Sequence, residues 1–119
     1  MTLRAALVAL LWLPGAVTAQ QATTGTGAVL RVLDKQTGAA EDVTLPAGGT
    51  ADRGLVEIRL DECRYPTGNP AGDAWAYVTI FYRGEADATF RGWMVASAPA
   101  LNALDHPRFD VWALRCTTS

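Results

Sequence analysis

Short apolar runs with a period of two, separated by turn signals, constrain the fold of this chain more than any other feature. Val56, Ile58 and Leu60 alternate with charged residues, which predicts a strand with one face toward water. Strands are expected at residues 28–33, 43–45, 55–61, 73–82, 89–96 and 111–116. Short strands at this spacing predict an all-β fold, either a small antiparallel β-sandwich or a partly open barrel of about six strands.

One segment has a helical signal. Ser97 is a suitable N-cap, and Pro99 fits the first turn of a helix. Leu101 and Leu104 lie three residues apart and would share one helix face. We therefore expect a single short helical turn near residues 99–105.

The first 19 residues have the three parts of a secretory signal peptide. Arg4 forms a short basic region, residues 5–13 are an unbroken apolar run, and small residues lead up to Ala19. This apolar run would span about 14 Å as a helix, roughly half of a hydrocarbon core, so no permanent anchor is expected. We therefore predict cleavage after Ala19, export to the periplasm, and no integral membrane span afterwards.

The rest of the chain is expected to form a single β domain over residues 28–117. Residues 20–27 are small and polar, which predicts a flexible N-terminal tail. The apolar runs at 28–33 and 43–45 flank a polar turn and predict a hairpin. Gly92 stands between bulky neighbours, which indicates a bulge or a close backbone approach.

The two cysteines, Cys63 and Cys116, both follow the predicted leader. Exported proteins fold in an oxidising compartment, so we expect a disulfide that joins the end of the third predicted strand to the last one. The alternative is a metal site built from both cysteines and His106. No CxxC or HxxxH spacing supports that alternative, and we expect no bound metal.

Composition argues against several classes of function. A chain of 119 residues with a formal net charge of −2 is too short for a two-domain cofactor enzyme and has no electrostatic attraction to nucleic acid. No GxSxG motif accompanies the one histidine. We expect no cofactor and no enzymatic activity.

A small hydrolase is the third alternative, with carboxylates drawn from Asp61, Glu62, Asp73, Asp105 and Asp110.

The segment at residues 73–82 is apolar on both faces, since Trp75 and Tyr77 alternate with aliphatic residues. We expect a central strand whose rings fill the core. In the alternative, Trp75, Tyr77 and Trp93 form a stripe that faces solvent and stacks on a sugar ring of a glycan such as peptidoglycan.

Two loops form the candidate contact surface for a partner protein. The stretch from Arg64 to Pro70 holds two prolines beside a cysteine, and the loop at residues 97–109 holds the isolated histidine. Rigid loops lose little entropy on binding. The residues predicted to contact a partner are Arg64, Tyr65, Pro66, Asn69, Pro70, Asn102, His106 and Arg108.

Two long stretches, DECRYPTGNPAGDAWAYV and FRGWMVASAPALNALDHPRFDVWALRC, and the opening AVLRVLDKQTG resemble the family known as domain of unknown function 2155. The resemblance covers residues 28–116. It implies small exported proteins of Gram-negative bacteria that share this cysteine pair and have no assigned catalytic residues. Genes of this family often lie near one for an accessory subunit of respiratory complex I, which suggests that enzyme as a partner.

These observations predict a non-catalytic periplasmic protein that acts as an accessory or scaffold by binding another component of the cell envelope. A glycan-binding or peptidoglycan-binding module that uses the aromatic stripe is the main alternative.

Overall fold

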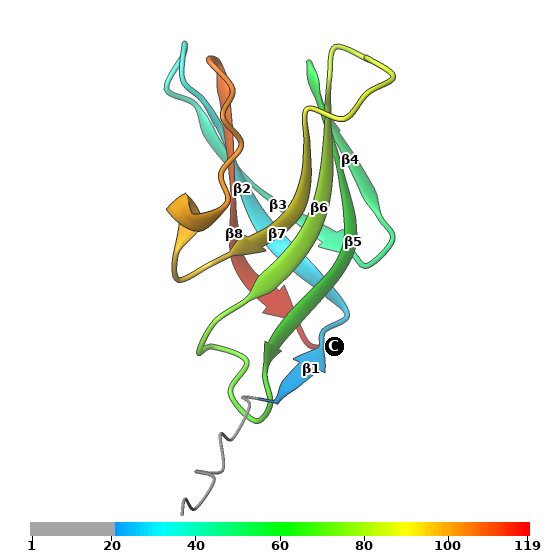
Figure 1. Ribbon diagram of the computed structural model, residues 1–119, viewed down its shortest axis with the longest axis vertical. Helices are drawn as coiled ribbons and strands as arrows, with labels where there is room; N and C mark the ends of the chain where they lie inside the picture. Colours follow the sequence, from blue (N-terminus) through cyan, green and yellow to red (C-terminus); the bar gives the residue numbers. More distant parts are fainter. Residues whose placement is uncertain (1–20) are drawn as a thin grey trace, which may run out of the picture.

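The computed structural model describes residues 21–119, which form two antiparallel β-sheets packed against each other (Figure 1). The predicted leader, residues 1–19, lies outside the described residues. The six predicted strands correspond to β2, β3 and β5 to β8, so the prediction of an antiparallel β-sandwich is confirmed. The strands are β1 (Ala22–Thr24), β2 (Gly27–Asp34), β3 (Ala40–Pro46), β4 (Thr50–Arg53), β5 (Val56–Pro66), β6 (Trp75–Tyr82), β7 (Phe90–Val95) and β8 (Phe109–Thr117).

The larger sheet has the order β1-β5-β6-β7, with β4 also paired to β5, and the smaller sheet has the order β3-β2-β8. The predicted hairpin is confirmed as β2 and β3. The chain passes between the sheets at two corners, where Gly25 donates its N–H to Cys63 O and Gly48 donates to Leu60 O. On the other side, the connection from β7 to β8 runs along the open edge of the sandwich (Figure 1).

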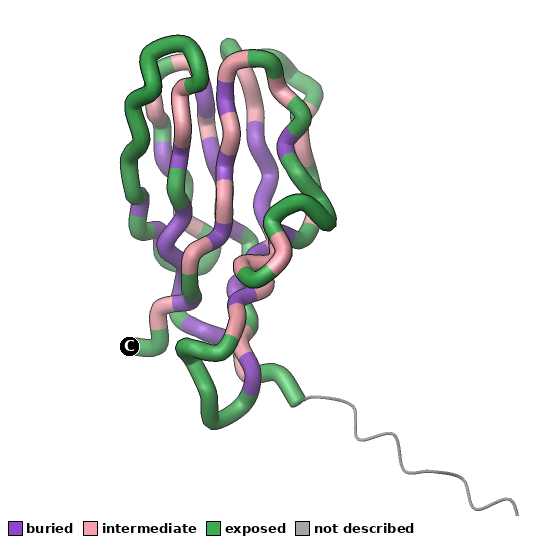
Figure 2. Tube along the Cα trace, turned by 90° about the vertical axis from the view of Figure 1, so that its left-hand side faces the viewer, coloured by how far each residue is buried: buried purple, intermediate pink, exposed green. Residues whose placement is uncertain are grey.

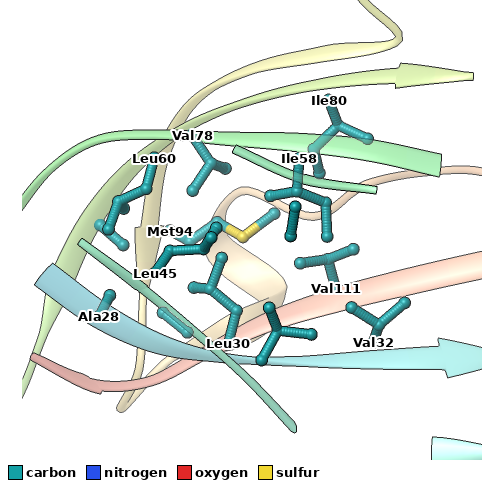
Figure 3. Close-up of a cluster of buried hydrophobic side chains, with 14 of the residues drawn as sticks. Ala28, Leu30, Val32, Leu45, Ile58, Leu60, Val78, Ile80, Met94 and Val111 are labelled. Carbon is teal, nitrogen blue, oxygen red and sulfur yellow. The ribbon is translucent and has the colours of Figure 1, made fainter. Parts of the chain in front are cut away.

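The core lies between the two sheets and is built from the alternate residues that the strand pattern predicts. Ile58, Leu60 and Val78 are at most 1% exposed and face Leu30 of the smaller sheet (Figure 3). Buried and exposed positions alternate along most strands (Figure 2). Burial of these branched aliphatic side chains is the main stabilising contribution to the fold.

Two β-bulges turn the cysteines into this core. Simple alternation would place Cys63 on the outer face of β5, and it would place Cys116 on the same face of β8 as Trp112. The register shifts between Leu60 and Glu62 in β5, and β8 shifts in the same way opposite Val29 and Leu30 of β2. Each shift adds one residue and reverses the side-chain parity. Both cysteines are therefore buried, and they form the predicted disulfide between the sheets, with a Cα–Cα distance of 5.6 Å.

The prediction of a flexible tail over residues 20–27 is wrong for residues 22–27. β1 pairs with the end of β5, where Thr23 lies opposite Tyr65, and Gly25 and Gly27 are buried. The backbone groups of β1 complete the edge of β5 beyond the end of β4. A strand held mainly by backbone hydrogen bonds needs few apolar side chains, so composition did not indicate it.

The predicted helical turn is confirmed as a single 3-10 turn, η1 (Pro99–Leu101). Ser97 does not cap it, because its N–H and its hydroxyl donate to the two carboxylate oxygens of Asp73 at 3.0 and 2.8 Å. Leu104 is buried as expected, but Leu101 is 77% exposed, since a turn this short does not form a continuous helix face. No helix among residues 21–119 is long and apolar enough to cross a membrane.

Gly27→Ala should lower the free energy of unfolding by about 1–3 kcal/mol, as overpacking does. A Cβ at this position would overlap the carbonyl oxygen of Leu45 on the paired strand β3. Gly92→Ala is the matched control, because its Cβ would meet the side-chain amide of Asn102 at 2.7 Å, and that amide can move. The predicted bulge or close backbone approach at Gly92 is wrong, because β6 and β7 pair through it without a register shift and a side chain approaches it instead. Urea titrations that give equal losses for both variants would contradict the expectation.

Candidate functional site

The aromatic residues of the predicted stripe lie on the outer face of the larger sheet. Trp75 and Tyr77 are half-buried on β6, and Trp93 on β7 is 37% exposed and lies directly opposite Tyr77. The expectation that these rings fill the core is therefore wrong. Ala76, Val78 and Met94 occupy the inner face instead.

The bulge in β5 places two carboxylates beside these rings. Leu60 and Cys63 point into the core, so Asp61 and Glu62 are left together on the outer side, across from Tyr77. Asp61 accepts a hydrogen bond of 3.4 Å from the Thr79 hydroxyl. A regular strand would place only one of two successive side chains on this face.

Asp61, Glu62, Tyr77 and Trp93 line an open hollow of about 400 Å³. The Tyr77 and Trp93 rings meet edge to face, with centroids 5.2 Å apart and planes at 77°. This arrangement is a preferred geometry for aromatic pairs, so the two rings support each other without being buried. The hollow joins apolar ring surface to carboxylate oxygens, a combination that suits binding more than filling of a core.

The hollow offers a ligand two carboxylates and the faces of two aromatic rings. Within residues 21–119 no group of three or more His, Cys, Asp and Glu side chains is placed to hold a metal ion. The alternative of a metal site built from Cys63, Cys116 and His106 is wrong, because the two sulfurs are bonded to each other. Of the carboxylates named for hydrolysis, Asp61 and Glu62 come together, whereas the carboxylate of Asp73 binds Ser97.

Arg64 and His106, from the two loops predicted to contact a partner, lie far apart. Arg64 lies opposite Trp75 at the start of β6, whereas the His106 ring packs on Tyr82 at its end. A strand of this length separates those points by about 23 Å. In the first loop Pro66 is buried and Tyr65 packs against the core, while Asn69 and Pro70 are exposed.

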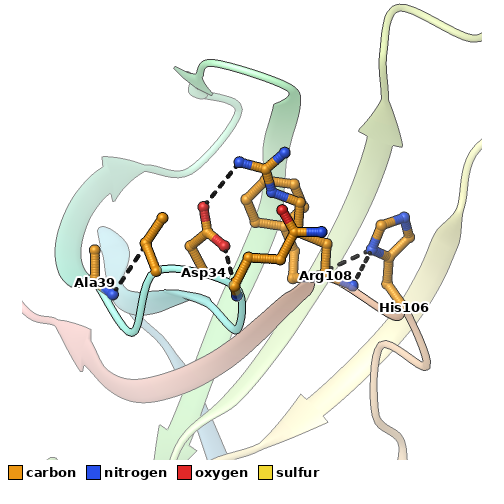
Figure 4. A network of polar contacts seen from close by, with 7 residues as sticks. Asp34, Ala39, His106 and Arg108 are labelled. Atoms are coloured by element: carbon orange, nitrogen blue, oxygen red, sulfur yellow. Dashed lines mark hydrogen bonds and ion pairs between the residues drawn. The ribbon is translucent and has the colours of Figure 1, made fainter.

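His106 holds its loop against the sheets (Figure 4). Its Nδ1 accepts hydrogen bonds from the backbone N–H groups of Arg108 and Phe109 at 3.1 and 3.2 Å. Its ring centroid lies 4.3 Å from that of Tyr82. Lys35 Nζ donates to the His106 carbonyl oxygen at 2.8 Å. These contacts give the histidine a structural part in fixing the loop.

Arg108 anchors the same loop to the β2–β3 turn. Its Nη2 donates to Asp34 Oδ2 at 3.1 Å, and its guanidinium lies over the Phe109 ring, 5.2 Å from the centroid (Figure 4). This hydrogen bond holds the pKa of Asp34 below its ordinary value, the N–H of Gln36 acts in the same direction, and burial opposes both.

The Asp34 contact predicts a specific acid dependence of stability. A carboxyl whose pKa is lower in the folded state stabilises the fold above its unfolded pKa, and the contribution disappears as pH falls through the folded value. Melting temperatures measured between pH 6 and pH 2 should therefore fall less for Asp34→Asn than for the parent. Arg108→Gln should flatten the same part of the curve. If melting temperature fell with pH as steeply in both variants as in the parent, this ion pair would not contribute to the acid dependence of stability.

A second hollow, of about 150 Å³, lies near the tips of β2 and β3 and includes Val32 and Phe109 in its lining. Its charged groups already have partners, because Arg53 Nε donates to Glu41 at 2.9 Å and Asp34 accepts from Arg108. The hollow of the outer face is therefore the better candidate site.

Sequence reasoning did not assign Asp61, Glu62 or Leu101 to a binding surface. The side-chain amide of Asn102 donates to the Trp93 carbonyl oxygen at 3.0 Å, which brings the neighbouring Leu101 to the edge of β7. Asn102, one of the residues predicted to contact a partner, is exposed, and its side chain covers part of this strand edge. The bulge has no signature in the strand pattern, so the pairing of Asp61 with Glu62 could not be read from alternation.

The fold and this surface define a disulfide-linked β-sandwich with an aromatic and charged outer face. The chain belongs to the family described as "Uncharacterized protein conserved in bacteria (DUF2155)", whose model matches residues 28–116. It is 32% identical over 87 residues to an uncharacterised protein of Rickettsia prowazekii (strain Madrid E), and the match covers 71% of this chain. The match covers 56% of the Rickettsia protein, so this chain spans little more than half of its relative. No solved structure matches the chain.

Proposed function

We propose that this protein is a non-catalytic, exported accessory protein that binds another protein of the cell envelope through the outer face of β5, β6 and β7. The observation that carries the proposal is the position of Trp75, Tyr77 and Trp93 on the solvent side of the sheet. Tyrosine, tryptophan and arginine are the residues most enriched at the centres of protein interfaces. Arg64 and Arg91 lie on the same face, beside these rings.

The edge of β7 adds a second apolar element to this face. Trp93 and Leu101 are the exposed large hydrophobic residues of the part of the chain that the structure describes. The hydrogen bond from Asn102 to Trp93 places them near one another, although they come from different elements. Exposed apolar groups that gather in one region indicate an interaction surface.

Export is supported by the disulfide, because such bonds persist in oxidising compartments. The signal-like leader supports the periplasm as the site of action. Respiratory complex I is the first partner to test, on the strength of the gene neighbourhood of the family.

A photo-crosslinking residue in place of Leu101 tests the proposal in living cells. We expect one discrete adduct, identified by mass spectrometry as an envelope protein, that disappears when Trp93→Ala is added. Thr44, exposed on the outer face of the opposite sheet, is the control position and should give no such adduct. Equal adducts from both positions, or an adduct that survives Trp93→Ala, would overturn the proposed surface.

A glycan is the second candidate ligand, because the hollow combines aromatic rings with carboxylates that accept hydrogen bonds from sugar hydroxyls. Sedimentation with purified peptidoglycan tests this candidate. Retention that is lost in a folded Trp75→Ala variant would favour it over a protein partner.

A further inference from the structure

The outer face of the larger sheet already holds one arginine between a carboxylate and an aromatic ring. Arg59 Nε donates to Glu57 Oε1 at 2.9 Å. The same guanidinium lies over the Phe81 ring, 4.7 Å from its centroid. Phe81 lies directly opposite Glu57 in the β5–β6 ladder. A guanidinium is suited to both contacts at once, because it pairs with carboxylates through its edge and stacks on rings through its face.

The same combination recurs on the other side of the molecule. Arg108 donates to Asp34 at 3.1 Å, and its guanidinium lies 5.2 Å from the Phe109 ring centroid. Two separate places in this fold therefore pair an arginine with a carboxylate and a ring.

The hollow of the outer face has the same carboxylate and aromatic ring as these two places. Glu62 lies directly opposite Tyr77, as Glu57 lies opposite Phe81, and the bulge adds Asp61 beside Glu62. Trp93 adds a second ring. Here no arginine from residues 21–119 lies over Tyr77 or Trp93, whereas arginines do lie over Phe81 and Phe109.

The charges at the hollow are also the least neutralised on this face. Asp61 makes no ion pair within the described residues, and its hydrogen bond from Thr79 is 3.4 Å long. The pair between Glu62 and Arg64 has an N–O distance of 3.5 Å, the longest ion pair in the described part of the chain. The four other ion pairs there are 2.8 to 3.1 Å long. Arg91 lies opposite Thr79 on the same face, but within the described residues it makes no ion pair with either carboxylate. Asp61 therefore has no cationic partner there, and Glu62 has only the long pair with Arg64.

We propose that the hollow formed by Asp61, Glu62, Tyr77 and Trp93 binds an arginine side chain presented by the partner protein. The inference rests on the proposed function, because it names the group on the partner that the outer face recognises. The carboxylates would accept the guanidinium N–H groups, and the rings would contact its flat face. A neutral sugar would use the hydrogen-bonding capacity of the carboxylates and leave their charge without a counterpart.

A titration with Nα-acetyl-arginine amide tests the chemistry on the purified, disulfide-bonded protein. The signal followed is the indole N–H resonance of Trp93, which is assigned by its loss in Trp93→Phe. We expect a saturable shift with the arginine derivative. The citrulline derivative, which has the same shape without the charge, should bind at least tenfold more weakly.

Variants identify the groups responsible. Asp61→Asn combined with Glu62→Gln should weaken arginine binding at least tenfold. Glu57→Gln is the matched control and should change it less than twofold, because Glu57 already pairs with Arg59. Equal shifts with citrulline, or full binding by the double variant, would overturn the inference. Shifts produced only by chitin oligosaccharides would overturn it in favour of a glycan.

The crosslinking experiment separates failure of this inference from failure of the proposed function. If the partner presents an arginine, the Leu101 adduct should be lost in the Asp61→Asn, Glu62→Gln variant as well as in Trp93→Ala. An adduct that is lost in Trp93→Ala but kept by the double variant would overturn the arginine inference and leave the binding face in place. Absence of a specific adduct in the parent would overturn the proposed function, while the titration would still report on the hollow.

Discussion

Replacing Cys63 and Cys116 together with alanine should lower the free energy of unfolding by about 4 kcal/mol in urea titrations. The disulfide spans a sequence separation of 53 residues and links β5 of one sheet to β8 of the other. Opening a loop of this length returns that much conformational entropy to the unfolded chain. Domains of this size have a total stability of roughly 5–15 kcal/mol, so the loss would be a large fraction of the whole.

Reduction of the parent protein provides the control for this expectation. A strong reductant should lower the parent to about the stability of the double variant and should leave the double variant unchanged. The comparison separates the cross-link from the packing of two sulfurs in the core, where Cys63 is 0% exposed. A difference below about 1 kcal/mol between oxidised and reduced protein would show that the two sheets do not depend on this link.

Alternation predicted the strands because one face of each sheet must exclude water. The pattern Val56, Ile58, Leu60 identified β5, and the matching residues of β6 complete the same buried layer. Alternation gave the wrong face for residues that follow a β-bulge, because the extra residue reverses the order of inward and outward side chains. By simple alternation along the sequence, Cys63 and Cys116 would point outward. A bulge in each strand turns them inward. The pairing was inferred from the compartment, whereas the geometry that allows it had no local signal.

The aromatic residues of the candidate site were predicted to face solvent only in the alternative interpretation, for a related reason. Trp75 and Tyr77 looked like core residues because large rings are usually buried. The small Ala76 and the branched Val78 and Ile80 fill the inner face, so the rings of β6 are left outside. Hydrophobicity alone does not decide which of two apolar faces of a strand is covered. That choice depends on what the opposite sheet can accommodate, which is a property of the whole fold.

Ile58→Ala should lower the free energy of unfolding by about 2–5 kcal/mol, whereas Trp93→Ala should lower it by less than about 1 kcal/mol. Ile58 is 0% exposed and lies between Ala51 of β4 and Ile80 of β6, so its loss leaves a cavity in the core. Trp93 is 37% exposed and rests on Tyr77 at the surface of the same sheet.

The measurement is a pair of urea titrations, with Thr50→Ala as an exposed control on the outer face of β4. If Trp93 filled the core, its truncation would cost about 3–5 kcal/mol, as removal of a buried tryptophan does. A loss of that size would place the ring in the packing of the sheet and contradict its assignment to a binding surface. A small loss keeps Trp93→Ala folded, so that a crosslink or an arginine shift missing from that variant reports on recognition alone.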